Sequence, residues 1–248
     1  IELYFLADSA ITNRVKDEGK KIEDYAKQFV QKVNEILGKL QPPGSIILTG
    51  IKTTDRKNEP YIQLSDNGQL DSLQTLQRVQ SYVKEQKINK QADVVLVVTG
   101  QSMFAQAGGK ISTSLGITSR KAACTEKNVV LVVHNNRPRS GPLTAAHELG
   151  HALGSPHDGT ESSKQCSGDS GYLMTPSANK QNLLFSECSK AAINEFLRTE
   201  AARCLFRRRC PDSANKERAT ATDPDVKMKN QQCLSKLYEN ERFLNATV

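Results

Sequence analysis

The chain carries T-A-A-H-E-L-G-H-A-L-G-S-P-H-D at residues 144–158, and this stretch says more about the fold than any other. Within it, His147, Glu148, His151, Gly154 and His157 stand in the order H-E-x-x-H-x-x-G-x-x-H. Residues four apart share one face of an α-helix, so His147 and His151 can direct two imidazoles at a single metal ion. Glu148 lies one step round the helix from His147, close enough to hold a water on that metal without becoming a ligand.

The second half of the stretch adds a third ligand. Gly154 is where the helix must stop, because only glycine readily takes the left-handed turn that ends it. That turn can swing His157 back to supply a third nitrogen, and three histidines leave the fourth position of zinc open for water, which is the catalytic arrangement. The alternative is that these are ordinary core or surface histidines. Three of the chain's four histidines stand here at ligand spacing and only His134 lies elsewhere, so we favour the metal site.

Composition sets wide bounds on the fold. At 248 residues the chain could be one large domain or a domain with an appendage, and 37% hydrophobic residues suffice for a substantial core. No apolar run approaches the roughly 20 residues of a membrane span, and the short apolar start at residues 1–6 predicts a strand and not a signal peptide. Because the chain does not begin with Met, we expect a processed or trimmed product.

The net charge is +7. Such a charge favours acidic surfaces, such as a heparan-type polysaccharide or an anionic membrane. The alternative, which we favour, is a solvated basic surface, because the charges are dispersed except at Arg207–Arg209. We expect no nucleic-acid partner, no transmembrane segment and a monomeric protein.

Six cysteines, an even number, include no C-x-x-C pair, which argues against a thiolate zinc site or a redox motif. Disulfides in a secreted protein are the better interpretation, although the sequence alone allows many pairings. Asn245 begins an N-glycosylation sequon that fits the same compartment. The predicted location is therefore extracellular.

Periodicity predicts alternating strands and helices over the first part of the chain, which is typical of an α/β layer with a mostly parallel sheet. The expected strands are residues 1–8, 45–53, 92–98, a short piece around 111–118 after a Gly-rich passage, and 128–134. The expected helices are one from about Ile11 to Leu40, one capped by Asp71 that runs to about Glu85, the helix after Gly141, and one from Glu187 to about Thr199. Residues 54–68 and 155–187 are predicted to be irregular.

These elements resemble a metzincin metalloendopeptidase of the reprolysin (adamalysin) group. The resemblance rests on the histidine motif, on Asp158 directly after its third His, and on G-Y-L-M-T-P at residues 171–176. Met174 looks like the family's Met-turn residue, which lies beneath the metal histidines; its separation from His157 fits better than the alternative of ordinary core filling. The compact form looks most like the secreted reprolysin-like proteases of tick saliva, followed by those of snake venom.

The resemblance implies a fold of the α/β (α+β) class. In this metzincin fold, an upper subdomain has a five-stranded mixed, twisted sheet with helices, a small irregular lower subdomain has a C-terminal helix, and zinc lies in the cleft between them. We therefore expect a catalytic domain at residues 1–206, with the upper subdomain at about 1–154 and the lower at 155–206. Residues 207–248 would be a short, basic, cysteine-containing tail.

The resemblance further implies disulfide pairs and a missing ion. The implied pairs are Cys124–Cys204 and Cys166–Cys188, which leaves Cys210–Cys233 for the tail. Many members bind calcium opposite the cleft, and Glu2 and Asp93 look like two of the ligands. The third position is Arg207, whose guanidinium would repel a cation and can pair with both carboxylates, so we expect no structural calcium.

Substrate contacts and support for the site are also implied by the resemblance. The family's edge strand, which pairs with an extended substrate by β-augmentation, corresponds to Leu115, Gly116, Ile117 and Thr118. An ordinary edge strand is an equally open interpretation of that segment. Thr175 and Pro176 would wall the pocket for the side chain after the scissile bond. Asp158 would be buried and would brace the Met-turn segment.

The leading hypothesis is a secreted zinc endopeptidase with Glu148 as general base. By analogy with salivary and venom enzymes, its substrates would be extracellular proteins such as fibrinogen, fibrin or matrix proteins. One alternative is a catalytically weak zinc-binding module that acts as a decoy or adhesion protein, although the intact motif and the lack of an Arg-Gly-Asp stretch argue against it. The other alternative is a polysaccharide- or membrane-binding protein driven by basic charge.

Overall fold

The computed structural model describes residues 1–135, 140–176 and 182–206. The chain divides into two units, Ile1–Ala202 and Arg203–Val248. The first unit contains the sheets and helices that position the histidine motif. The predictions for Arg207, Cys210, Cys233 and Asn245 fall outside the described residues.

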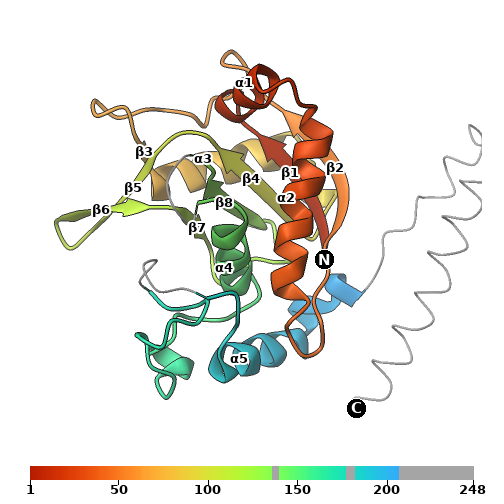
Figure 1. The fold of residues 1–248 in the computed structure, drawn as a ribbon, viewed down its shortest axis with the longest axis vertical. Helices are drawn as coiled ribbons and strands as arrows, with labels where there is room; N and C mark the ends of the chain where they lie inside the picture. Colours follow the sequence, from red (N-terminus) through yellow and green to blue (C-terminus); the bar gives the residue numbers. More distant parts are fainter. Residues whose placement is uncertain (136–139, 177–181, 207–248) are drawn as a thin grey trace, which may run out of the picture. The chain divides into compact units, whose positions relative to one another are not determined.

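A mixed sheet, with five strands in the part of the chain that the structure describes, forms the centre of the first unit (Figure 1). Its order is β2 (Ile47–Thr53), β1 (Glu2–Ala7), β4 (Val94–Thr99), β8 (Val129–Val133) and β7 (Gly116–Thr118). The first four strands run parallel, and β7 pairs antiparallel with β8. Every residue of β4 and β8 is buried, as their continuous apolar sequences predict for strands covered on both faces. The expected five-stranded mixed sheet is confirmed.

Helices α1 (Ser9–Asp17) and α2 (Ile22–Leu37) replace the single helix expected from Ile11 to Leu40, so that prediction was wrong. The break comes at Gly19, whose φ of 67° lies in the left-handed region. The N–H of Lys20 then donates to the carbonyl of Val15 at 3.0 Å and closes the end of α1. Residues 16–21, K-D-E-G-K-K, are polar and exposed, so the break removes no apolar side chain from the buried face of either helix.

A smaller sheet, of three strands among the residues described, was not expected. Strand β3 (Leu70–Asp71) pairs parallel with β5 (Met103–Ala107), which forms a hairpin with β6 (Lys110–Ser114). Gly108 and Gly109 make the turn of the hairpin with φ values of 55° and 74°, a conformation that glycine adopts freely. The single strand expected around residues 111–118 is therefore two strands, β6 and β7, in two different sheets.

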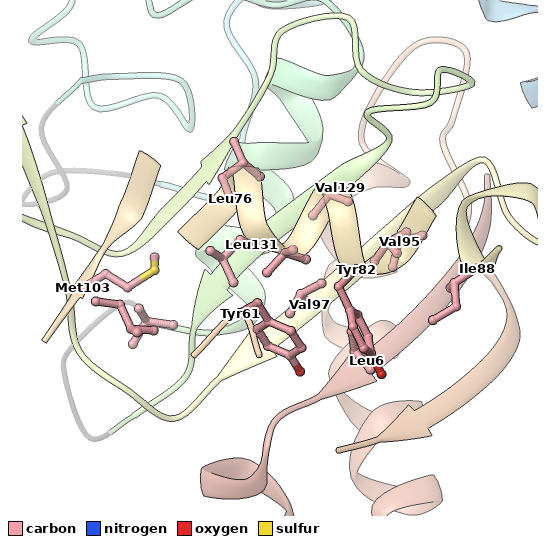
Figure 2. Packing of buried hydrophobic residues seen from close by; sticks show 14 residues of the cluster. Leu6, Tyr61, Leu76, Tyr82, Ile88, Val95, Val97, Met103, Val129 and Leu131 are labelled. Atoms are coloured by element: carbon pink, nitrogen blue, oxygen red, sulfur yellow. The ribbon is translucent and has the colours of Figure 1, made fainter. Parts of the chain in front are cut away.

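Helix α3 (Ser72–Glu85) covers one face of the central sheet (Figure 2). Its residues Leu76, Val79 and Val83 join one buried cluster with alternate residues of three strands: Leu6, Val95, Val97, Val129, Leu131 and Val133. Strand side chains alternate between the two faces. Phe5 accordingly points to the opposite face, where its ring centroid lies 6.1 Å from that of Tyr25 and 5.6 Å from that of Phe29 on α2.

Helix α4 (Pro142–Ala152) contacts α2 and strands β7 and β8. Between α4 and α5 (Glu187–Leu197), the residues that the structure describes are irregular apart from the 3-10 turn η2 (Glu161–Ser163), and the 3-10 segment η3 (Glu200–Phe206) follows α5. A further 3-10 turn, η1 (Ile88–Lys90), precedes β4. Figure 1 shows α4 between the central sheet and α5. None of the helices in the described ranges is long and apolar enough to cross a membrane.

Candidate metal centre

Helix α4 begins and ends at residues suited to its two termini. Pro142 stands in its first turn, where a backbone N–H needs no partner, after Gly141 with a φ of 86°. The helix ends at Ala152, and Gly154 follows with a φ of 101°. A Cβ at position 154 would also lie 2.9 Å from the Cβ of Phe196 on α5. Glycine is therefore required at this position by the turn and by the packing of α5.

The three histidines of the motif meet at one point. The Nε2 atom of His157 lies 3.2 Å from Nε2 of His147 and 3.1 Å from Nε2 of His151. The carbonyl of Leu173 is 2.7 Å from Nδ1 of His147, and the carbonyl of Ser155 is 2.7 Å from Nδ1 of His151. A carbonyl accepts only, so both Nδ1 atoms carry the proton and both Nε2 atoms present a lone pair.

This arrangement fits a bound cation. In neutral imidazoles, a proton on His157 Nε2 could serve only one of the two facing lone pairs, and the other would be repelled. Nitrogens bound to one tetrahedral zinc ion at about 2.0–2.1 Å lie about 3.3 Å apart, close to the separations found here. An all-histidine set of three nitrogen donors also matches the preference of zinc. The donor chemistry and the spacing therefore both fit zinc.

The protonation state of the three imidazoles agrees with this fit. Burial lowers the pKa of His147 to about 3 and that of His151 to about 4. The nearby His157 and Arg120 lower the pKa of His151 further, and burial also lowers the pKa of His157. All three side chains are therefore neutral at physiological pH, which is the form that binds a metal.

Glu148 lies against strand β7. Its residue is 6% exposed, and burial raises the pKa of its carboxyl to about 8. A Cβ at position 116 would lie 2.7 Å from Cγ and 2.8 Å from Oε1 of Glu148. Gly116 is therefore the residue that lets the backbone of β7 approach the carboxyl of Glu148.

Met174, the residue expected to form a Met-turn, packs against helix α4. Met174 is fully buried, and a Cβ at Gly150, between His147 and His151 in the helix, would lie 2.6 Å from its sulfur. The preceding Leu173 supplies the carbonyl that orients His147. Met174 and Leu173 thus support α4 from below through packing and through a backbone hydrogen bond.

Asp158 braces two segments by different routes. Its backbone N–H donates to the carbonyl of Met174 at 2.9 Å. Its buried carboxylate accepts hydrogen bonds from the hydroxyls of Ser186 at 2.6 Å and Ser189 at 3.1 Å, at the start of α5. The link to the Met-turn is therefore a main-chain contact, while the side chain holds α5.

The residues expected to contact substrate lie in two segments, one on β7 and one directly after Met174. Leu115 to Thr118 are half-buried, and β7 is an edge strand of the central sheet in the described part of the chain. Thr175 is buried with its hydroxyl on the carbonyl of Gly168, and Pro176 is exposed. Thr175 therefore shapes the segment after Met174 from within, and only Pro176 of this pair offers its side chain to solvent.

The disulfides and the calcium position are partly described. Cys166 and Cys188 form a disulfide with Cα atoms 6.1 Å apart, which ties the irregular segment after His157 to α5. Cys124 and Cys204 each belong to a disulfide, and their pairing stays a prediction. The N–H of Glu2 donates to Oδ2 of Asp93 at 2.8 Å, and both residues are buried. The absence of calcium stays a prediction too.

Sequence reasoning missed several residues that shape the site. The carbonyls of Leu173 and Ser155 carry no sequence signal, because every residue has a carbonyl. Gly150 did carry one, since glycine inside a helix costs about 1 kcal/mol against alanine and so indicates a close packing partner. Arg120 and its ion-pair partner Glu161 are far apart in the sequence and were not recognised.

A family model described as "Reprolysin (M12B) family zinc metalloprotease" matches residues 1–208. The venom metalloproteinase BumaMPs1 of Olivierus martensii is 27% identical over 206 residues, which cover 79% of this chain and 52% of that protein. The snake venom metalloproteinase trimerelysin-2 of Protobothrops flavoviridis is 25% identical over 208 residues, which cover 83% of this chain and 95% of that protein. The chain spans little more than half the length of some relatives, 52% of BumaMPs1 and 58% of antarease TserMP_A of Tityus serrulatus.

Solved structures show the same architecture at low identity. The archaemetzincin of Methanopyrus kandleri superposes with a TM-score of 0.51 at 14% identity, covering 80% of this chain and 96% of that one. A chain from a chaperone-substrate complex gives a TM-score of 0.52 at 12% identity, covering 83% of this chain and 34% of that one. These likenesses bear on the fold alone.

Proposed function

Because the chain belongs to the reprolysin (M12B) family of zinc metalloproteases, we propose that it is a secreted zinc endopeptidase that cleaves extracellular proteins. The observation that carries the proposal is the meeting of three imidazole nitrogens within 4.8 Å of one another, next to the buried carboxyl of Glu148. The nearby backbone of β7 gives an extended substrate an edge to pair with.

His147, His151 and His157 would hold the zinc ion through their Nε2 atoms. Their neutral state and the carbonyl partners of His147 and His151 keep two of the donors in place before metal binds. When bound, zinc supplies Lewis acidity and makes water a stronger nucleophile near neutral pH.

Glu148 serves as the general base in this proposal. Its carboxylate takes the proton of the attacking water and delivers it to the nitrogen of the leaving amine. Burial raises the pKa of this carboxyl to about 8. That value lies close to working pH, where a group can both accept and release a proton.

Strand β7 positions the substrate in this proposal. A peptide paired with β7 would pass the Gly116 backbone, which lies against Glu148, and so place a peptide carbonyl beside the base. Thr175 would set the backbone of the pocket wall through its hydrogen bond to Gly168, and Pro176 would form the exposed face of that wall. The pocket would receive the side chain after the scissile bond.

Secretion is supported by chemistry and by the relatives. Cys166 and Cys188 form a disulfide. Disulfides persist in oxidising compartments and are rare in the cytosol. The relatives named above are described as venom metalloproteinases, which suggests extracellular protein substrates for this chain as well.

The test is a chelator-sensitive proteolysis assay on casein, fibrinogen, fibronectin and collagen, with zinc quantified in the same sample. We expect cleavage that stops with a zinc chelator and returns on adding zinc back. Glu148→Ala should keep zinc and lose cleavage by about 10²–10⁴-fold, the range of general acid-base catalysis. A zinc-loaded Glu148→Ala protein that cleaves casein as fast as the parent would overturn the proposed mechanism.

A further inference from the structure

An ion pair that the proposed mechanism does not use lies at one end of β7. The guanidinium of Arg120 contacts the carboxylate of Glu161 through Nη1 and Oε2. Arg120 follows the last residue of β7, Thr118, after Ser119, and Glu161 opens the 3-10 turn η2. Both side chains remain reachable from solvent, with 41% and 59% of their surface exposed.

Each member of the pair is attached to the candidate metal centre. The N–H of Lys121, next to Arg120, donates to the carbonyl of His151 at 3.0 Å. On the other side, the N–H and the hydroxyl of Thr160, next to Glu161, donate to the carbonyl of His157 at 3.2 and 2.7 Å. The pair therefore joins the segment that leaves the substrate edge to the loop that follows the third histidine.

The backbone at this pair is held in an unusual conformation. Glu161 has a φ of 44° and Lys121 a φ of 58°, both in the left-handed region although neither is glycine. A non-glycine residue in that region costs roughly 1–2 kcal/mol, so the surrounding contacts must hold it there. Two such residues, one beside Arg120 and the other its partner Glu161, define the backbone from which the two opposite charges project.

We propose that Arg120 and Glu161 form a charge-reading subsite, which recognises the charge of a substrate side chain several residues from the scissile bond. The inference rests on the proposed function. Gly116 marks the place of bond cleavage because it lies against Glu148. Arg120 comes two residues after β7 ends at Thr118, so a substrate paired with β7 that extends past the end of the strand meets Arg120 beyond the residues next to the reacting bond.

Each charge selects a different side chain. Arg120 attracts an acidic substrate residue and repels a basic one, while Glu161 does the reverse. In the parent enzyme the two charges offset each other, so discrimination is small. Removing either charge leaves the other uncompensated and should produce opposite preferences.

The test uses the zinc-loaded full chain and synthetic peptides built around a bond that the parent cleaves in casein. In two peptide series, Asp, Asn or Lys is placed three or four residues from that bond, on its N-terminal or its C-terminal side. In one of the two series, Arg120→Gln should lower the ratio of kcat/KM for the Asp peptide over the Lys peptide about two- to fivefold, and Glu161→Gln should raise it by a similar factor, as expected for exposed charge pairs. Both changes should reside in KM and should weaken at high salt.

The controls separate charge reading from mere bracing. Arg120→Lys should keep the parent's order of preference. Lys84→Gln removes an ion pair of the same exposed kind, Lys84 to Glu126 at 2.8 Å, and should leave the ratio unchanged. If Arg120→Gln and Glu161→Gln alter Asp and Lys peptides equally, or not at all, the proposal is wrong. A parent enzyme that cleaves no peptide in a zinc-dependent way would instead overturn the proposed function itself.

Discussion

His134, at the carboxyl end of β8, and the three histidines of the candidate metal centre share one property. Burial lowers the pKa of His134 to about 4, as it does for His151. The four histidines differ, however, in the groups that their ring nitrogens contact. Nδ1 of His134 is 2.5 Å from the hydroxyl of Tyr25, and its ring stacks on that of Tyr25 with centroids 5.7 Å apart.

The motif histidines instead direct Nε2 toward one another. A phenol hydroxyl can donate to the lone pair of an imidazole nitrogen, so the contact with Tyr25 gives His134 a structural role without a metal. Two lone pairs that face each other, by contrast, need a cation between them. Burial and a lowered pKa therefore do not by themselves identify a metal ligand. What identifies a metal ligand is the group that its ring nitrogen contacts.

The largest expected effect that tests this comparison is on metal content. His151→Ala should lose stoichiometric zinc and lower the thermal midpoint by about 10 °C or more, because metal binding to a folded site adds several kcal/mol to its stability. His134→Ala should keep zinc despite losing its contacts with Tyr25 and Phe29. Zinc content by atomic absorption and the midpoint by circular dichroism measure both. Full zinc in His151→Ala would refute the ligand assignment.

Two glycines allow a matched test of the supporting contacts. A Cβ at Gly150 would lie 2.6 Å from the Met174 sulfur, and a Cβ at Gly141 would lie 2.5 Å from Cδ2 of His134. Both alanine variants should lose about 1–3 kcal/mol of stability through overpacking, and Gly141→Ala should lose more because alanine is strained at the φ of 86° that Gly141 adopts. Gly150→Ala alone should also weaken zinc binding, because it displaces the segment whose Leu173 carbonyl orients His147. Urea unfolding and competition with a chromophoric zinc chelator separate the two effects, and equal zinc loss in both variants would contradict the comparison.

The titration of His134 gives a smaller effect with a definite sign. Its ordinary pKa of 6.5 falls to about 4 in the folded protein. As pH falls through this window, the unfolded chain binds a proton that the folded protein does not, so the free energy of unfolding decreases. The contribution is present in full above pH 6.5 and is lost progressively toward pH 4. His134→Gln should therefore lose less stability than the parent between about pH 7 and about pH 5.

This prediction is tested by urea unfolding of the parent and the His134→Gln variant at each of the two pH values, with chelator present in every sample. Under those conditions the motif histidines titrate in both proteins and their contribution cancels. Identical pH dependence in parent and variant would mean that His134 is not held neutral by its surroundings.

What the sequence predicted correctly was local. The histidine motif could be recognised because ligand spacing on one helix and the glycine that ends it are fixed by nearby positions, 147 to 157. Strands β4 and β8 were recognised because their apolar residues are consecutive. The Asp71 cap of α3 is likewise a short-range contact, with its side chain accepting from the N–H of Gln74 at 2.9 Å.

What could not be predicted depends on contacts between distant segments. Strand β3 has two residues and gains its definition only from pairing with β5. The break between α1 and α2 was hidden because apolar residues resume at helical spacing after Lys21. The pair of Arg120 and Glu161 arises from the way the loop after His157 folds back on the end of β7, which no local pattern encodes.

The smallest expected effect concerns Ser186, whose hydroxyl contacts the carboxylate of Asp158, the residue after the third histidine. Ser186 caps α5 by accepting from the N–H of Ser189 at 3.1 Å, and its hydroxyl also donates to the Asp158 carboxylate. Ser186→Ala should cost about 1 kcal/mol, the usual loss for a helix cap, with slightly more from the carboxylate's lost donor. Asp71→Ala at the cap of α3 is the matched control, since it lacks the second contact. Zinc should stay bound in both, because Asp158 holds Met174 through its backbone N–H, which neither substitution touches. Loss of zinc in Ser186→Ala alone would show that side chains, and not only the main chain, keep His157 in place.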